Sequence, residues 1–196
     1  MQKGLETRRD IVERATQLFA ELGYAGVSIE AVLAACQISR GALYHHFAGK
    51  EALFEAVFEA VEISITERTT AVAGRAQTPA GALRAGCDSF LDFAGEKAVR
   101  QITLIDAPTA LGWAKWREID ERHAFGLLKA ALAQASAGGA LPAELVDNFA
   151  HMLLASLMEV ALLIARADDH AAATALGKAS IQTLLDRLLG AAPAAG

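Results

Sequence analysis

The sequence predicts an all-helical protein, and three observations support that fold class. Alanine and leucine, both strong helix formers, supply much of an apolar content of 54%, which is ample for a buried core. Only four prolines occur in the 196 residues. No stretch alternates apolar and polar residues over a length that would predict a sheet. We therefore expect about nine helices.

The first predicted helix begins at Thr7, because Asp10 follows three residues later in the manner of a capping box. Apolar residues then recur at helical spacing along one face. They are Ile11, Ala15, Leu18, Phe19 and Leu22. Gly23 is the expected C-cap of this helix.

Two short helices are predicted next. Ser28 is a good N-cap for the first of them, and Glu30 in its first turn complements the helix dipole. The segment Gln37–Ser39 is too short to be anything but a tight turn, and Ser39 can cap a helix from Arg40 to about His46, with Leu43 and Phe47 facing inward. Two short helices joined by a tight turn and packed on a preceding helix form a helix-turn-helix.

In the rest of the sequence, the spacing of apolar residues predicts mostly longer helices. The expected helices cover residues 50 to about 73, 79 to 94, a short one through 99–105, a long one from 113 to about 137, one from 142 to about 167, and a last one ending near 189. We expect a break at 106–108, because a proline disfavours helix at the residue before it. Residues 191–196 are predicted to be a frayed tail.

One motif gives a family resemblance. The run Ser39-Arg-Gly-Ala-Leu-Tyr-His-His-Phe47, followed by Gly49-Lys-Glu-Ala-Leu53, closely resembles the DNA-binding domain of the TetR family of transcriptional regulators. The resemblance covers about the first 55 residues and includes Gly23-Tyr24 and the entry to the second helix. Gln37-Ile38 departs from it, since the family more often has Gly-Val there. It implies a helix-turn-helix DNA-binding domain over residues 1–50 and a helical ligand-binding and dimerisation domain over residues 51–190.

The resemblance implies a role in DNA binding for nine residues. The positions that contact phosphates in the family are matched by Ser28, Tyr44, His46 and Lys50. The recognition helix begins after the cap Ser39 with Arg40 and Gly41. Within it, Ala42 can touch a thymine methyl and His45 can face the groove. Without the motif, Arg40 and Lys50 would be solvated surface charges, and Tyr44 could simply pack on the first helix. Adjacent histidines on a helix point about 100° apart, so we expect no metal site at His45-His46, and no cofactor.

The charge distribution fits a polyanion-binding amino-terminal segment only weakly. Residues 1–50 hold six basic and five acidic residues, whereas the remainder holds twelve basic and eighteen acidic residues, within a net charge of −5.

Cys36 and Cys87 are expected to be reduced thiols rather than a disulfide. No signal peptide opens the sequence, and the apolar run around Leu153 to Ala165 looks too short to span a bilayer. We therefore expect a cytoplasmic protein without a membrane partner.

The second domain must house an effector site and a dimer interface, as the resemblance implies. Candidate ligand contacts are aromatic or polar residues of the central helices: Phe90, Asp106, Trp113, Trp116, His123, Phe125 and Met152. Ordinary core packing is an open alternative for each of them, and Asp106 could instead cap a helix. The last two helices have broad apolar faces, which predicts a homodimer through a four-helix bundle. Alternatively, both faces are buried within the monomer.

The function we expect is a ligand-responsive regulator, a repressor released from a palindromic operator by a small molecule. The sequence does not fix the sign of the response, so a ligand-dependent activator or a co-repressed regulator stays open. An enzyme is not expected, because no glycine-rich phosphate loop, nucleophile elbow or metal-ligand cluster occurs and no catalytic residue is predicted. The remaining rival is a helical interaction protein that does not bind DNA.

Overall fold

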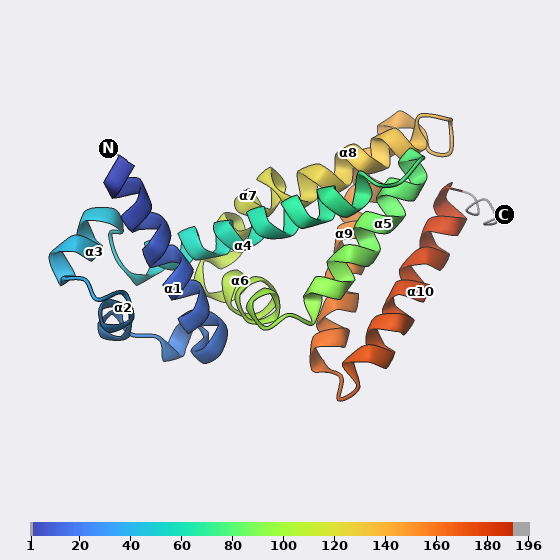
Figure 1. The fold of residues 1–196 in the computed structure, drawn as a ribbon. Coiled ribbons are helices and arrows are strands. Elements are labelled where there is room, and N and C mark those ends of the chain that lie inside the picture. Colours follow the sequence, from blue (N-terminus) through green and yellow to red (C-terminus); the bar gives the residue numbers. More distant parts are fainter. Residues whose placement is uncertain (1, 190–196) are drawn as a thin grey trace. The chain divides into compact units, whose positions relative to one another are not determined.

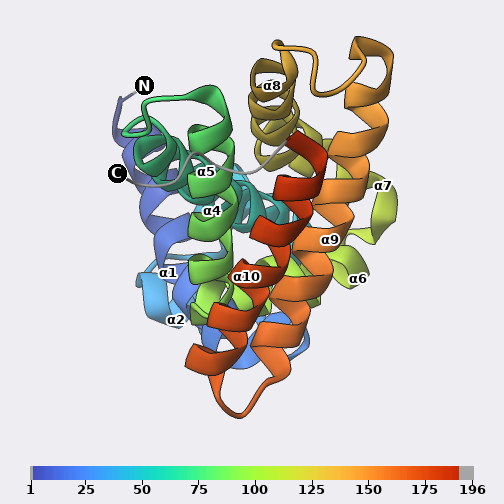
Figure 2. The same ribbon diagram turned by 90° about the vertical axis from the view of Figure 1, so that its right-hand side faces the viewer.

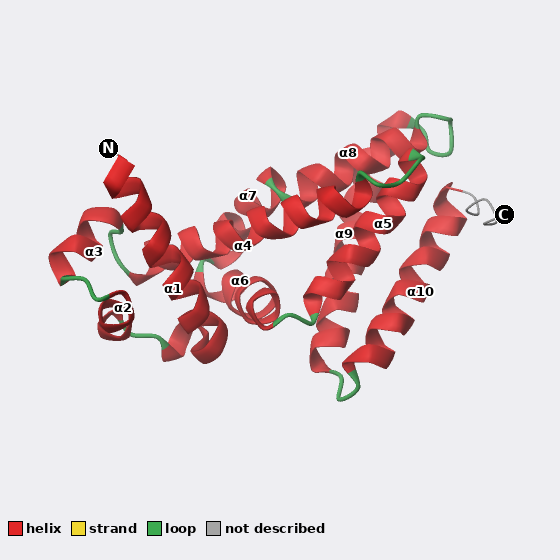
Figure 3. Cartoon of the chain, in the orientation of Figure 1, coloured by secondary structure: helices red, strands yellow, loops and turns green. Residues whose placement is uncertain are grey.

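The computed structural model describes residues 2–189, and every regular element in that range is a helix (Figure 3). The all-helical fold class is therefore confirmed. The elements are α1 (Gln2–Gly26), α2 (Ile29–Cys36), α3 (Arg40–His46), α4 (Lys50–Ala73), α5 (Pro79–Ala94), the π-helix η1 (Val99–Asp106), α6 (Ala107–Ala110), α7 (Gly112–Arg122), α8 (Ala124–Ser136), the 3₁₀-helix η2 (Ala143–Leu145), α9 (Val146–Arg166) and α10 (His170–Leu189). The predicted tail, residues 191–196, lies outside the described residues.

These helices form two compact units that do not follow chain order. The first unit comprises the chain up to Ile63 together with Lys97–Ile119, and the second comprises Ser64–Glu96 and the chain from Asp120 on. Helix α4 contributes to both units, and so does α7. The predicted domain boundary after residue 50 is a division by function, and it stays a prediction.

The first unit is built on α1, drawn in blue in Figure 1. This helix begins at Gln2, so the prediction that Thr7 caps its start is wrong, because the helix continues through Thr7 towards the amino terminus. Gly23 has φ +69° and interrupts α1 where the C-cap was expected, before a last turn that ends at Gly26. The core of the unit is apolar and aromatic, and its fully buried members include Ile11, Ala15, Phe19, Leu53 and Phe54.

Two predicted breaks after α5 lie elsewhere. Pro108 does not interrupt the chain, because it lies in the first turn of α6, where a missing N–H costs nothing. The break falls instead at Gly112, whose φ is +76°. The single long helix predicted from residue 113 is two helices, α7 and α8, separated at His123 with φ −117° and ψ −93°. Pro142 precedes the short η2 turn rather than opening the long helix α9 directly.

The second unit is a bundle in which α5, α8, α9 and α10 pack together. Helices α9 and α10 run side by side in opposite directions, drawn in orange and red in Figure 2. Gly177 of α10 permits this close approach, because a Cβ at that position would lie 2.6 Å from Cγ1 of Val160. The face of α9 that is buried in the bundle carries Leu153, Leu157, Ala161 and Ile164.

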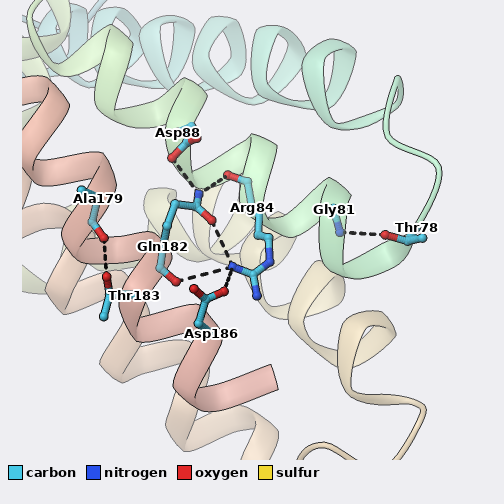
Figure 4. A network of polar contacts seen from close by, with 8 residues as sticks. All are labelled: Thr78, Gly81, Arg84, Asp88, Ala179, Gln182, Thr183 and Asp186. Atoms are coloured by element: carbon cyan, nitrogen blue, oxygen red, sulfur yellow. Dashed lines mark hydrogen bonds and ion pairs between the residues drawn. The ribbon is translucent and has the colours of Figure 1, made fainter. Parts of the chain in front are cut away.

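Polar contacts fix α10 to α5 within this bundle (Figure 4). The guanidinium of Arg84, whose side chain is only 11% exposed, lies 2.7 Å from the Asp186 carboxylate. The amide of Gln182 donates to Asp88 Oδ1 at 2.8 Å and accepts from Arg84 at 3.1 Å. Because this side of α10 is held by buried and half-buried polar groups, its position relative to α5 is well defined.

Helix α9 with its preceding turn is also apolar enough to cross a membrane by length and composition, contrary to the expectation from its apolar run. The segment is Ala143–Arg166, and 33% of its most apolar window is buried within the chain. In the second unit α9 packs against α5, α8 and α10, as the core helix of a bundle does. We therefore interpret its apolar character as packing surface.

Candidate nucleic-acid interface

Two serine caps set the backbone of the helix-turn-helix. The hydroxyl of Ser28 accepts a hydrogen bond from the Ala31 amide at 3.1 Å, and the hydroxyl of Ser39 accepts one from the Ala42 amide at 3.2 Å. Both serines have extended backbone conformations, as N-caps require. The starts of α2 and α3 are therefore fixed as predicted, and each presents the positive end of a helix dipole.

The turn between α2 and α3 is closed by Gln37 in the left-handed conformation, with φ +54° and ψ +41°. Its amide donates to the carbonyl of Ala34, and the Ile38 amide donates to that of Leu33. A side chain in this conformation costs about 1 kcal/mol relative to glycine. This explains in physical terms why the family more often has glycine where this chain has Gln37.

Helix α3 presents one face outward. Leu43 and Phe47 are buried, as predicted, with 1% and 4% of their surfaces exposed. Tyr44 is 45% exposed, although it is a large aromatic residue. The other candidate contacts on this helix divide into exposed residues (Arg40, Gly41 and His45) and half-buried ones (Ala42 and His46). An exposed tyrosine among polar residues on a short capped helix suits contact with a polar partner.

The cations of this region each contact a specific neighbour. Arg40 forms an ion pair with Glu30 of α2 at 2.5 Å, and this hydrogen bond raises the pKa of Arg40. Lys50 Nζ lies 4.3 Å from the ring centroid of Tyr24, and the Arg8 guanidinium lies 5.0 Å from that of Phe47. These cation–π contacts fix basic side chains close to the ends of α3 and α4 while leaving N–H donors available.

Tyr24 is the point at which several elements of the first unit meet. Its amide donates a hydrogen bond of 2.7 Å to Oδ2 of Asp106, at the end of η1. Its ring stacks at 6.1 Å on Phe19 and meets Phe54 edge-on at 4.8 Å. Burial, and then the charge of Glu51, raise the pKa of its hydroxyl. The residue that follows the break in α1 is therefore held by α1, α4 and η1 together.

Further polar groups in η1 and just before it surround the end of α1. Gln101 Nε2 donates at 3.0 Å to the same Asp106 oxygen, and Lys97 forms an ion pair with Glu21. A Cβ at Gly23 would lie 3.1 Å from Gln101 Nε2, so a glycine suits this contact as well as the positive φ. The sequence signals only a short helix here and an acid that could cap one, so it does not reveal that Asp106 binds a backbone amide 82 residues away.

The candidate ligand contacts do not form one set. Asp106, Trp113 and Trp116 belong to the first unit, whereas Phe90, His123, Phe125 and Met152 belong to the second. Trp113 stacks on the buried Trp116 at 4.8 Å and is itself 67% exposed. Phe125 is buried and stacks on His151 at 4.4 Å, whereas Met152 is 60% exposed. The buried and half-buried aromatic residues of the second unit are thus the better candidates.

The metal-ligating and nucleophilic side chains indicate no metal site and no reactive thiol at Cys87 among the described residues. Within residues 2–189, no group of three or more His, Cys, Asp or Glu side chains is arranged to hold a metal ion. Cys36 and Cys87 are both free thiols, as expected. Burial raises the pKa of Cys87 to about 12, so this thiol stays protonated and unreactive at neutral pH.

Comparison with known proteins matches both parts of the chain. Residues 11–57 match the family model for bacterial regulatory proteins of the tetR family, and residues 80–188 match a tetracyclin repressor-like C-terminal domain. UidR of Escherichia coli, an HTH-type transcriptional regulator, is 45% identical over 51 residues, which is 26% of each protein. The chain thus spans about a quarter of the length of this curated relative.

Two solved structures resemble the whole chain. A TetR-family transcriptional regulator from Pectobacterium atrosepticum is 30% identical, with a TM-score of 0.80 and coverage of 96% of this chain and 97% of that one. AibR, at 23% identity and a TM-score of 0.67, shares the fold over 95% of this chain and all of that one.

A capped helix-turn-helix at the start of the chain, followed by a repressor-like C-terminal region, is typical of a DNA-binding transcriptional regulator. The chain belongs to the TetR family.

Replacing Asp106 tests the contact at Tyr24. We expect Asp106→Ala to lower the free energy of unfolding by about 1–3 kcal/mol, because a half-buried backbone amide loses its acceptor. Asp106→Asn, which keeps an oxygen acceptor, should cost less. Urea unfolding measures both. Asp168→Ala, in an exposed turn, is the control. Equal stability of Asp106→Ala and the control variant would contradict this assignment.

Proposed function

We propose that this chain is a cytoplasmic, dimeric transcriptional repressor that binds a near-palindromic operator and is released by a small-molecule effector. The observation that carries the proposal is the outward face of α3, where Arg40 and Tyr44 are exposed behind the Ser39 cap. A short helix with this exposure can enter the major groove, as recognition helices do.

Residues around α3 supply the expected phosphate contacts. Ser28 uses its oxygen as an acceptor within the N-cap, so its hydroxyl proton remains available to donate to a phosphate. Lys50, although its ammonium lies over the Tyr24 ring, keeps N–H donors on its outer side. Ser39, Gly41, Ala42, His45 and His46 complete the proposed interface. Phosphate contacts would fix the register of α3, and base contacts would give specificity.

The proposed dimer interface is the outer face of α9 and α10. Large apolar side chains are exposed there, on the side of each helix away from its buried residues: Met152 (60%) and Leu163 (58%) on α9, and Leu176 (71%) and Leu184 (42%) on α10. The opposite side of α10 is already held to α5 by Arg84 and Gln182. Packing these faces against a second copy would bury them in a four-helix bundle, and the two-fold symmetry of such a dimer would match the two half-sites of a near-palindromic operator.

The proposed effector site lies in the second unit. The hydroxyls of Thr66, Thr69 and Ser89 are buried and have no hydrogen-bond partner among the described residues. Gly86, one turn before Ser89, lies against Thr69, so α4 and α5 approach each other closely there. A buried hydroxyl without a partner costs about 1–3 kcal/mol. A ligand with polar groups would recover that energy, and Phe90, His123 and Phe125 are aromatic candidates to complete the site.

A fold neighbour supports the combination of ligand and DNA. AibR was solved in complex with isovaleryl coenzyme A and operator DNA. We propose the same pairing of an effector and an operator here, with the effector left unspecified. Since α4 contributes to both units, a ligand that shifts α4 would also move Lys50 and the contacts of Tyr24. Effector and operator would then weaken each other's binding by the same factor.

Selection of DNA fragments by the purified protein tests the function. We expect an inverted repeat to be recovered from random double-stranded DNA, and the double variant Tyr44→Ala, Lys50→Ala to lose binding to it by at least about a hundredfold, because two phosphate contacts are removed per protomer. Circular dichroism should show that the variant remains helical. Recovery of fragments with no shared sequence would contradict the proposal.

Substitutions on the outer face of α9 and α10 test the proposed dimer interface. Leu163→Glu and Leu176→Glu should each raise the dimer dissociation constant by at least about tenfold, because a charge would be buried without a partner. Sedimentation equilibrium measures this directly. Leu145→Glu, another exposed leucine of the second unit that lies outside the proposed face, is the control. If both variants remain as dimeric as the control, the interface lies elsewhere.

A further inference from the structure

The ion pair between Glu30 and Arg40 joins the two helices of the helix-turn-helix at their first turns. Glu30 lies in the first turn of α2, directly after Val27–Ile29, and Arg40 is the first residue of α3. Arg40 donates from one terminal nitrogen to Glu30 Oε1 at 2.5 Å. The two side chains are 57% and 67% exposed, so the pair lies on the surface that would meet DNA.

We propose that Glu30 is a positioning residue that holds Arg40 to read a guanine in each operator half-site, rather than to neutralise a phosphate. The proposal rests on the proposed operator binding and names what the first residue of α3 recognises. It assigns to Glu30, an acid on a DNA-facing surface, a role in specificity.

Charge is the first argument for a base contact. A carboxylate paired with the guanidinium makes the pair neutral as a whole, so it releases few counterions when it approaches a phosphate. A guanine edge, by contrast, presents two neutral acceptors, O6 and N7, that match the fork of an arginine. The hydrogen bond to Glu30 uses one N–H of one terminal nitrogen, and Tyr44 is a second, weaker partner of Arg40. A guanidinium has five N–H donors, so two of them can still form that fork.

Rigidity is the second argument. The caps at Ser28 and Ser39 fix the backbone on which both charged residues stand. The backbone amide at Glu30 and then the hydrogen bond from Arg40 lower the pKa of the Glu30 carboxyl, so the pair persists at neutral pH. Because a long arginine loses rotamer freedom on binding, an arginine that is already held loses less, and discrimination between bases increases.

The test uses the inverted repeat that the unmodified protein selects from random DNA, with each guanine replaced in turn by 7-deazaguanine, which lacks the N7 acceptor. We expect one guanine per half-site at which this replacement weakens binding of the unmodified protein by roughly tenfold. Glu30→Gln should reduce that factor to about threefold or less, and Arg40→Ala should abolish it. Glu13→Gln, the same change at an exposed acid of α1, should leave it intact.

The salt dependence of DNA affinity distinguishes a base contact of Arg40 from a phosphate contact. If the arginine reads a base, Arg40→Ala leaves the slope of log affinity against log salt nearly unchanged. A slope that falls by about one per protomer would instead mark a phosphate contact and overturn the proposal. Tighter binding by Glu30→Gln with unchanged base discrimination would also overturn it, because Glu30 would then compete with DNA for Arg40. Failure to select any shared sequence would overturn the proposed function itself, and this proposal with it.

Discussion

The first unit depends on the hydrogen bond from the Tyr24 amide to the Asp106 carboxylate. Gly23 interrupts α1 with a positive φ, and the next amide therefore needs an acceptor outside the regular helix. Asp106 supplies one from η1. Once the backbone is held there, the ring of Tyr24 can pack on Phe19 and Phe54 and lie beneath the ammonium of Lys50. One contact thereby joins α1, η1 and the start of α4, the helix that also extends into the second unit.

In the helix-turn-helix, too, the basic side chains are held by specific neighbouring groups. Arg40, Lys50 and Arg8 each have a defined neighbour, so their direction is set before any DNA arrives. The net charge of −5 therefore says little about what this surface binds. In the second unit, polar contacts similarly fix one side of α10, while leucines remain exposed on α9 and α10. Each proposed interface is thus an outward face of helices that are held by contacts on their other side.

Sequence patterns predicted the features that depend on interactions between residues close in the chain. The caps Ser28 and Ser39, the turn at Gln37 and the inward positions Leu43 and Phe47 could all be derived from sequence spacing, because each depends on residues a few positions away. The start of α1, the π-helical form of η1 and the break at His123 could not, although a short helix was predicted through 99–105, because no strong helix breaker or cap stands at Gln2, within η1 or at His123. The sequence predicts Asp106 as a ligand contact or a cap, but its partner lies 82 residues away, beyond the reach of any local pattern.

Amide hydrogen exchange at Tyr24, followed by NMR in the unmodified protein, tests the role of this contact most directly. If Asp106 holds the end of α1, the Tyr24 amide exchanges slowly, at a rate close to that of the interior amides of α1 such as Ala15. Exchange at the rate of the exposed amide of Ala48, which lies between α3 and α4, or faster would show that the bond to Asp106 does not persist in solution. The joining of α1, η1 and α4 through Tyr24 would then be contradicted.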